Sequence, residues 1–396
     1  MKISVQLGNV GSVKDSSGPL GGVTVVEFAG IGPAPFAAMI LAGLGAEVIR
    51  IDKPASVGSS TVTDLFTSDL MNRDRRSIAL DLKSPAAVGI IKRLVAKADG
   101  IIEGFRPGVM ERLGLGPDDL SDVNPKLTFV RMTGWGQFGP LAPRAGHDLN
   151  FIALTGLLNA IGTKESPVIP LNLVGDFGGG GTMAAIGMLA GILSARITGK
   201  GSIIDAAIVD GVSLMGTMFQ GLIARGLWSL ERYDNLLDGG APFYAIYRCA
   251  DGNGIALAAL EPKFFAELVS RLGVADHPAF ENQYGRDTWP EMRRVLAEIF
   301  AREKREYFER LFEGADACVV AVNNFMEAEL HPHMRERNMF EEVNGVTHPR
   351  PAPRFKDFNP TISAPPFPGE HKDEILEELG FSAHEILVLE GSGAFG

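Results

Sequence analysis

The first third of the chain alternates short apolar runs, rich in β-branched residues, with longer amphipathic segments. Residues 23–29 are such an apolar run and predict a strand, and residues 47–52, 100–103 and 127–132 are the further predicted strands. The segments 36–44 and 84–96 have helical spacing, and Pro85 fits a first helical turn, where its missing N–H has no role. Strands separated by helices predict right-handed βαβ units and therefore a Rossmann-like parallel sheet.

The middle of the chain continues this pattern and then changes it. Four consecutive glycines at 178–181 precede an apolar helical segment that ends near residue 199, and residues 203–209 form a further predicted strand. Two strand-like runs, 243–247 and 255–260, flank the turn 251–254 and predict an antiparallel pair followed by helices. We expect a large α/β domain over 18–210, a helical connection over 211–242 and a small α+β domain over 243–340.

The two ends of the chain differ in character. Proline accumulates between 349 and 368, which predicts an extended segment, and an amphipathic helix follows at 371–379. We expect residues 350–396 to return to the large domain and complete it. Residues 1–17 are polar and lack the apolar core of a signal peptide, and the apolar stretch 183–197 is too short to span a bilayer. These features predict a cytoplasmic protein without a membrane span.

Composition excludes several classes of protein. The chain is 45% hydrophobic and 21% charged, as ordinary globular proteins are. A formal net charge of −11 argues against a dedicated nucleic-acid binder, so a polyanionic ligand would need a local basic cluster. The two cysteines, Cys249 and Cys318, have no metal-ligand spacing and indicate a reducing compartment. We expect no metal site.

The turn after the first predicted strand resembles part of a dinucleotide fingerprint. Gly30 and Gly32 follow that strand, and Asp52 ends the next one, where an acid would hold a ribose. Pro35 replaces the glycine that would allow close helix–strand packing. An ordinary βα turn is the favoured interpretation, and an NAD-dependent oxidoreductase is the alternative.

Basic residues gather near the predicted strand ends, where open parallel sheets bind ligands. Arginine suits phosphate oxygens, so a multiply phosphorylated ligand is one interpretation and a charge-balanced, solvated surface is the other. The residues are Arg50, Lys53, Arg73, Arg75, Arg76, Lys83, Arg106 and Arg112.

Two segments contain candidate acid–base residues. His147 opens an apolar helical run, where the positive end of the helix dipole favours a neutral imidazole that can accept a proton. Asp176 precedes the four glycines, whose backbone N–H groups we expect to lie at a helix N-terminus and to stabilise developing negative charge. The alternative in each case is a residue that only caps a helix.

Several motifs, taken in order, resemble the family III CoA-transferase superfamily. They are Asp52-Lys53-Pro54, Asn72-Arg73-x-Arg75-Arg76, Asp81-Leu82-Lys83, Gly104-Phe105-Arg106-Pro107-Gly108 and Met132-Thr133-Gly134-Trp135-Gly136. Within the superfamily, four further motifs are similar to those of alpha-methylacyl-CoA racemases. They are Gly146-His147-Asp148-Leu149-Asn150, Asn172-Leu173-Val174-Gly175-Asp176, Asp238-Gly239-Gly240-Ala241-Pro242 and Ala317-Cys318-Val319. The resemblance runs from about residue 18 to about residue 379.

The resemblance implies an isomerase of lipid metabolism that inverts the α-carbon of 2-methylacyl-CoA thioesters by two-base proton transfer through an enolate. His147 and Asp176 match the catalytic pair, and Glu261 matches an acid that supports the histidine. It also implies an interlocked homodimer whose active site lies between the large domain of one chain and the small domain of the other, with no cofactor beyond the CoA of the substrate. From the resemblance and from part of the basic set above, the expected CoA contacts are Arg50, Lys53, Leu80, Asp81, Leu82, Lys83, Gly104, Arg106, Arg112, Gly146, Asp148, Leu149, Asn150 and Phe151.

The nearest alternative is a CoA transferase of the same superfamily, in which the aspartate at position 176 attacks the thioester and forms an acyl anhydride. His147 distinguishes the two, because a transferase needs no second base there. Three features depart from the family: about 16 extra residues before Gly18, a lengthened stretch at 59–69, and Lys53 in place of an arginine.

Overall fold

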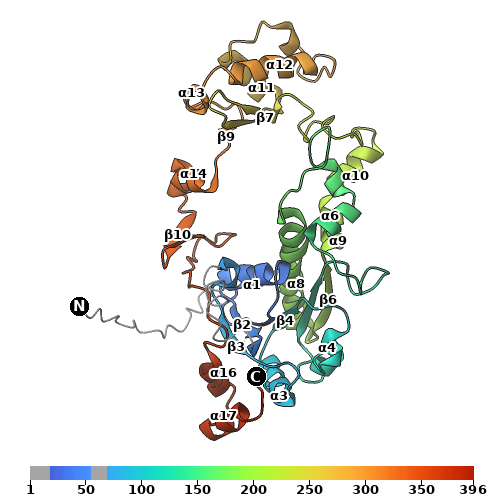
Figure 1. Ribbon diagram of the computed structural model, residues 1–396, viewed down its shortest axis with the longest axis vertical. Helices are drawn as coiled ribbons and strands as arrows, with labels where there is room; N and C mark the ends of the chain where they lie inside the picture. Colours follow the sequence, from blue (N-terminus) through green and yellow to red (C-terminus); the bar gives the residue numbers. More distant parts are fainter. Residues whose placement is uncertain (1–17, 55–68) are drawn as a thin grey trace, which may run out of the picture. The chain divides into compact units, whose positions relative to one another are not determined.

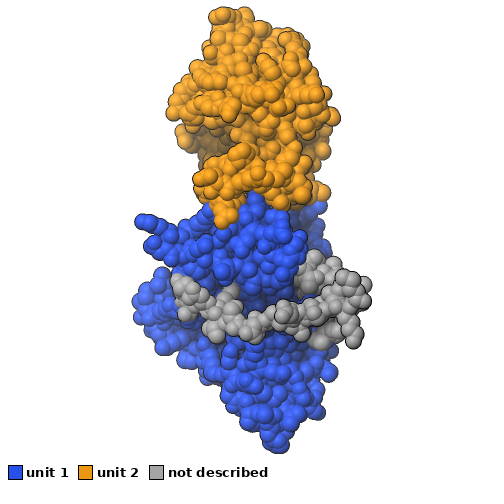
Figure 2. Space-filling model, turned by 90° about the vertical axis from the view of Figure 1, so that its left-hand side faces the viewer, with its two compact units in different colours: residues 1–151, 172–214, 340–396 blue, residues 152–171, 215–339 orange. Residues whose placement is uncertain are grey.

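The computed structural model describes residues 18–54 and 69–396, which divide into two compact units (Figures 1 and 2). The first unit contains the described residues up to 151 together with 172–214 and 340–396, and the second contains 152–171 and 215–339. The residues before Gly18 and nearly all of the stretch 59–69 lie outside the described residues. The domain boundaries expected above remain a prediction.

A six-stranded parallel sheet forms the centre of the first unit, as predicted. The strand order is β3-β2-β1-β4-β5-β6, which reverses direction between β1 and β4. The predicted strands at 47–52 and 100–103 are present with those boundaries, whereas β3 was not predicted. The strands are β1 (Thr24–Phe28), β2 (Glu47–Asp52), β3 (Arg76–Ala79), β4 (Gly100–Glu103), β5 (Thr128–Thr133) and β6 (Ser202–Ala207).

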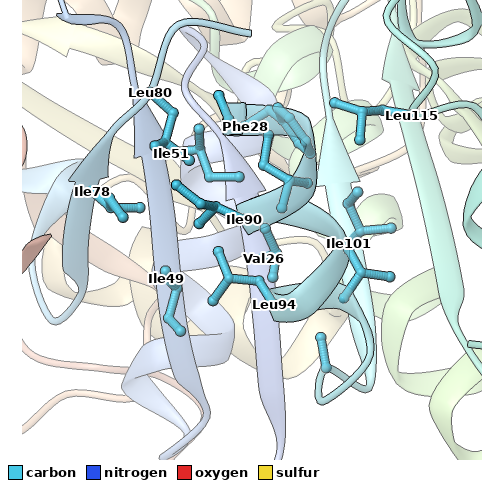
Figure 3. Close-up of a cluster of buried hydrophobic side chains, with 14 of the residues drawn as sticks. Val26, Phe28, Ile49, Ile51, Ile78, Leu80, Ile90, Leu94, Ile101 and Leu115 are labelled. Carbon is cyan, nitrogen blue, oxygen red and sulfur yellow. The ribbon is translucent and has the colours of Figure 1, made fainter. Parts of the chain in front are cut away.

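Helices cover the sheet because successive side chains of each strand point to opposite faces. On one face, Ile90 and Leu94 of α3 (Pro85–Val95) pack against Val26, Ile49 and Ile101 (Figure 3). The helix α1 (Pro33–Gly43) contacts α8 (Thr182–Thr198), which in turn packs against β5 and β6. Shorter helices of this unit are η2 (Leu70–Asn72), α4 (Val109–Arg112) and α5 (Pro117–Ser121).

The helix α8 continues a π-helical segment, η3 (Leu173–Gly181). Together they form a 26-residue apolar helix, Leu173–Thr198, which is long and apolar enough to cross a membrane. The helix extends beyond the predicted apolar stretch 183–197 at both ends. Since α8 packs against α1, β5 and β6, we interpret it as a core helix.

The C-terminal segment belongs to the first unit. The N–H of His371 donates to the Ser77 carbonyl at 2.9 Å, and the Ser77 N–H donates to Nδ1 of His371 at 3.2 Å. The helix α16 (Lys372–Glu378) packs beside β3, and α17 (Ala383–Glu390) follows it. A hairpin of β10 (Phe340–Val343) and β11 (Val346–Pro349), which was not predicted, precedes this segment.

The second unit contains a three-stranded antiparallel sheet, β7-β8-β9, with helices. The predicted pair is present as β7 (Tyr244–Arg248) and β8 (Gly254–Ala258), and the short third strand β9 (Val319–Ala321) was not predicted. The smaller α+β domain that the sequence predicts is thus confirmed. The remaining helices are α6 (Asp148–Leu154), α7 (Leu157–Ala160), α9 (Ile208–Met215), α10 (Thr217–Ala224), α11 (Pro262–Arg271), η4 (Pro278–Phe280), α12 (Trp289–Phe300), α13 (Arg305–Leu311), α14 (Phe325–Leu330) and α15 (Pro332–Glu336). Of these, α6 and α9 each have residues in both units.

Candidate active site

The predicted ligand-binding residues of the first unit follow the carboxyl ends of its parallel strands. Lys53 comes after β2, residues 80–83 come after β3, and residues 104–106 come after β4. The loop with Gly30 and Gly32 comes after β1, so it and the loop after β4 flank the point where the strand order reverses. Open α/β sheets bind ligands at such a point.

Four basic residues that follow these strands have exposed side chains: Lys53, Lys83, Arg106 and Arg112. The N–H of Lys83 donates to Oδ1 of Asp81 at 3.0 Å, which orders the turn after β3. Leu80 is 1% exposed and its side chain is in the core. If Leu80 contacts a ligand, the contact must therefore be made by its backbone.

Arg50 does not lie at this surface. It is 4% exposed, and its guanidinium donates to Glu27 at 2.8 Å and to Asp52 at 3.0 Å. Arg75 is also buried and donates to the same Glu27. Arg50 lies within strand β2, and its charge is paired with the buried carboxylates of Glu27 and Asp52 inside the unit. We therefore correct its prediction as a CoA contact and leave it out of the proposed binding residues.

Asp52 is equally occupied. Its Oδ1 accepts from Arg50, and its Oδ2 accepts from the Ser77 hydroxyl at 2.7 Å, with 4% of the residue exposed. An acid that recognises a ribose must present free carboxylate oxygens to it. The local structure thus disfavours the nicotinamide alternative.

Asp176 lies in the first turn of η3, beside the loop after β1. A Cβ placed on Gly32, whose φ is +72°, would lie 3.2 Å from Oδ2 of Asp176, so glycine leaves room for the carboxyl group. Partial burial and then the negative charge of Asp148 raise the pKa of Asp176 above its ordinary value. A hydrogen bond from the Asn172 side chain and the nearby His147 act in the opposite direction.

His147 is exposed and immediately precedes α6. Its carbonyl accepts the N–H of Asn150 at 2.8 Å, and its N–H donates to Oδ1 of Asn150 at 3.1 Å, so the start of the helix fixes the backbone of His147. The next residue, Asp148, is 8% exposed, and its Oδ1 accepts the N–H of Asp176 at 2.7 Å. This bond joins the beginnings of α6 and η3 and brings the two catalytic candidates to one place.

An aromatic pair supports the His147 segment. Phe151 and Trp135 meet edge to face with their ring centroids 4.7 Å apart. A Cβ on Gly134 would lie 2.0 Å from the Phe151 ring, and one on Gly146 would lie 2.7 Å from it. Both glycines therefore allow the backbone to approach this pair closely. Leu149 and Asn150 are exposed on the same helix.

The four glycines do not lie at a helix N-terminus, and that prediction is wrong. The helix begins at Leu173, so Asp176 lies within its first turn and residues 178–181 are inside it. A Cβ on Gly179 would lie 2.6 Å from Val212, and one on Gly181 would lie 2.7 Å from the Pro33 carbonyl oxygen. The glycines allow close packing against α9 and the start of α1, and their N–H groups take part in helical bonding.

Glu261 belongs to the second unit, where it is the exposed residue before α11. Burial and then the charge of Glu261 raise the pKa of the Cys318 thiol, so Glu261 lies close to Cys318. Its predicted support of His147 remains a prediction.

Glu103 is a buried titratable group that sequence reasoning missed. It ends β4 directly before Gly104 and is 1% exposed. Burial raises its pKa to about 7, although it accepts from the Phe105 N–H at 2.7 Å and from Arg131 at 3.2 Å. Its position at a strand end in an apolar run is the signal that could have singled it out.

Within residues 18–54 and 69–396, no group of three His, Cys, Asp or Glu side chains is arranged to hold a metal ion.

Residues 20–372 match the family described as CoA-transferase family III. The alpha-methylacyl-CoA racemase of Homo sapiens is 42% identical over 375 residues, which cover 93% of this chain and 96% of that relative. A succinyl-CoA:glutarate CoA-transferase of Mus musculus is 29% identical, covering 92% of this chain and 87% of that relative. A crystal structure of a CAIB/BAIF family protein from Brucella suis superposes with a TM-score of 0.79 at 26% identity, covering 91% of this chain and 99% of that one. The resemblance stated above is thereby confirmed, and so is the prediction that the chain is an enzyme of the isomerase class.

Proposed function

We propose that this chain, which belongs to CoA-transferase family III, is a racemase that inverts the α-carbon of 2-methylacyl-CoA thioesters. The hydrogen bond between Asp148 and the Asp176 amide is the observation that carries the proposal. It brings a histidine and an aspartate from separate segments to the carboxyl edge of the sheet, where a two-base reaction needs both groups.

The reaction begins when the α-carbon–hydrogen bond breaks and the proton passes to an unprotonated imidazole nitrogen of His147. The electron pair delocalises onto the thioester oxygen as an enolate. Asp176 then delivers its proton to the opposite face of the α-carbon, and the two groups exchange roles in the reverse direction. The raised pKa of Asp176, caused by partial burial and the charge of Asp148, favours the protonated form that this step needs.

The enolate oxygen needs hydrogen-bond donors. Since the glycines at 178–181 are inside a helix, we place these donors at the first turn of α6, where the N–H groups of Asp148 and Leu149 precede the first helical bond, donated by Asn150. In η3 the Asp176 N–H is already bound to Asp148, so only the N–H groups before it could contribute. Such donors act on charge that develops in the transition state.

The CoA part of the substrate would lie along the carboxyl edge, between the turns after β2, β3 and β4. Its phosphates would meet the exposed side chains of Lys53, Lys83, Arg106 and Arg112. Binding there is remote from the reacting carbon and can position it between the two bases. We further propose a homodimer in which Glu261 of the second unit supports His147, and we propose no additional cofactor.

Hydrogen exchange tests this proposal. The protein is incubated with each epimer of a 2-methylacyl-CoA in deuterated water, without any acceptor acid, and deuterium at the α-carbon is followed by mass spectrometry. We expect deuterium in both epimers and interconversion between them. The His147→Ala variant should lose exchange from one epimer far more than from the other, because only one base then remains. Equal loss from both epimers, or no loss, would contradict the two-base assignment.

The second candidate is a CoA transferase, which the 29% identical succinyl-CoA:glutarate CoA-transferase favours. In that reaction the Asp176 carboxylate attacks the thioester carbonyl, CoA leaves as the thiolate and an acyl anhydride remains. The same incubation separates the two candidates. Absence of exchange without an acceptor acid, together with CoA transfer once an acid is added, would replace the racemase proposal.

A further inference from the structure

We propose that Asp148 is a positioning residue for Asp176: its carboxylate holds the amide at the start of the Asp176 helix and places a negative charge beside the Asp176 carboxyl group, which keeps a proton available there. This inference rests on the proposed function for its catalytic meaning. The geometry that carries it belongs to the first unit alone.

The first observation is the hydrogen bond itself. The first helical bond of η3 is donated by the Phe177 N–H to the Asn172 carbonyl, so the N–H of Asp176 precedes it and has no partner within the helix. Oδ1 of Asp148 accepts this N–H at 2.7 Å. A residue 28 positions earlier in the chain thus caps the helix that carries Asp176.

The second observation is burial. Asp148 is 8% exposed, although it lies in the first turn of a helix whose neighbouring residues His147 and Leu149 are exposed. A carboxylate in so closed a position interacts with its neighbours through little water, and its charge is weakly screened. Asp148 is therefore placed to act on the Asp176 carboxyl group electrostatically as well as through the amide.

The charged groups around Asp176 are few. In the part of the chain that the structure describes, the charged side chains that act on this carboxyl group are Asp148 and His147, both from the α6 segment. On its own element Asn172 contributes a neutral hydrogen bond, and the loop before α1 contributes Gly32. Asp148 opposes ionisation of Asp176, whereas protonated His147 and Asn172 favour it.

This arrangement bears on the reaction, because one half-reaction needs Asp176 protonated and the other needs it ionised. Partial burial alone disfavours the ionised form. Asp148 adds to that effect while its hydrogen bond keeps the carboxyl-bearing helix in place. The same residue thus sets where the acid is and how readily it keeps its proton.

Two substitutions separate these roles. Asp148→Asn keeps an oxygen that can accept the Asp176 N–H but removes the charge, whereas Asp148→Ala removes both. The first readout is the pH profile of kcat/KM for epimerisation. For Asp148→Asn we expect the limb of the profile that reports Asp176 to move to lower pH, because the substitution removes a negative charge that opposes ionisation of Asp176. For Asp148→Ala we expect the same move and a further loss of kcat.

Asp99→Asn is the matched control. Asp99 also accepts a backbone N–H, that of Thr24 at 3.0 Å, but it lies at the amino edge of the sheet. Its substitution should leave the pH profile in place. An unchanged limb in Asp148→Asn, with thermal stability equal to that of the unmodified protein, would overturn the proposal.

A second readout does not depend on activity. The protein is labelled with carboxyl-¹³C aspartate, the Asp176 resonance is assigned by comparison with Asp176→Asn, and its chemical shift is followed against pH. Asp148→Asn should titrate Asp176 at lower pH. If the unmodified protein exchanges no α-proton but this titration still moves, the proposed function fails and the positioning role stands; if exchange occurs and the titration does not move, the reverse holds.

Discussion

Arg50 and Lys53 lie three residues apart, and the structure places them in opposite surroundings. Arg50 is buried between Glu27 and Asp52, whereas Lys53 is exposed at the carboxyl edge of the sheet. We predict that Arg50→Met lowers thermal stability and leaves the KM for acyl-CoA unchanged. We predict that Lys53→Met raises KM and changes the thermal stability less than Arg50→Met does.

The magnitude for Arg50 follows from what remains after its removal. Breaking a buried ion pair costs about 3–5 kcal/mol, because it leaves a charge without its partner. Glu27 keeps Arg75, and Asp52 keeps the Ser77 hydroxyl, so we expect a value near the lower end. About 3 kcal/mol corresponds to a decrease in Tm of roughly 6–12 °C for a domain of 150–250 residues.

For Lys53, an exposed contact with a phosphate contributes less than a buried one. A loss of about 1 kcal/mol would raise KM roughly fivefold. Differential scanning calorimetry measures the first effect, and initial rates against acyl-CoA concentration measure the second. If Arg50→Met raised KM at unchanged Tm, Arg50 would belong to the binding site and the reasoning from its burial would be refuted.

Two further substitutions test the local geometry and the electrostatics. Gly32→Ala places a Cβ 3.2 Å from Asp176 Oδ2 in a backbone conformation that disfavours alanine, so we expect a roughly tenfold lower kcat from about 1–2 kcal/mol of strain; unchanged kinetics would show that the carboxyl group does not need this space. Glu103 has a folded-state pKa of about 7 against an ordinary 4.5, so the folded state holds more protons between these values and stability falls as pH rises through that range. Glu103→Gln should remove a pH dependence of the free energy of unfolding, at most about 3 kcal/mol between pH 4.5 and 7. Calorimetry at both pH values measures this, and an equal pH dependence in the variant would contradict the prediction.

The strands that the sequence predicts well have β-branched apolar residues in succession. In residues 47–52 these are Val48, Ile49 and Ile51, and in residues 100–103 they are Ile101 and Ile102, all of them buried. The strand β3 has the sequence Arg-Ser-Ile-Ala, and its arginine and serine conceal it. Ser77 is nevertheless fully buried, because its backbone and hydroxyl bond to the C-terminal segment and Asp52.

The sequence places the candidate basic residues at strand ends more accurately than it places the start of the glycine-rich helix. The exposed basic residues at 53, 83, 106 and 112 follow from the rule that ligands bind beyond the carboxyl ends of parallel strands. Arg50 is also basic and is close to Lys53 in the sequence. Because side chains alternate between the two faces of a strand, however, its side chain points into the interior of the unit. The glycines at 178–181 were misplaced because a sequence motif does not show where a helix begins when a π-helical turn precedes it.

The contact between Asp148 and Asp176 marks the limit of local pattern reasoning. Capping rules pair a side chain with an amide two or three residues away, and they made His147 and Asp176 candidate caps of their own helices. The structure instead pairs the carboxylate of one helix with the amide of another, 28 residues on. Such a pairing depends on where the parallel sheet brings the two helix beginnings, which is a property of the topology. A two-base site on this sheet therefore requires the correct register of β1, β5 and β6 before either catalytic side chain can be placed.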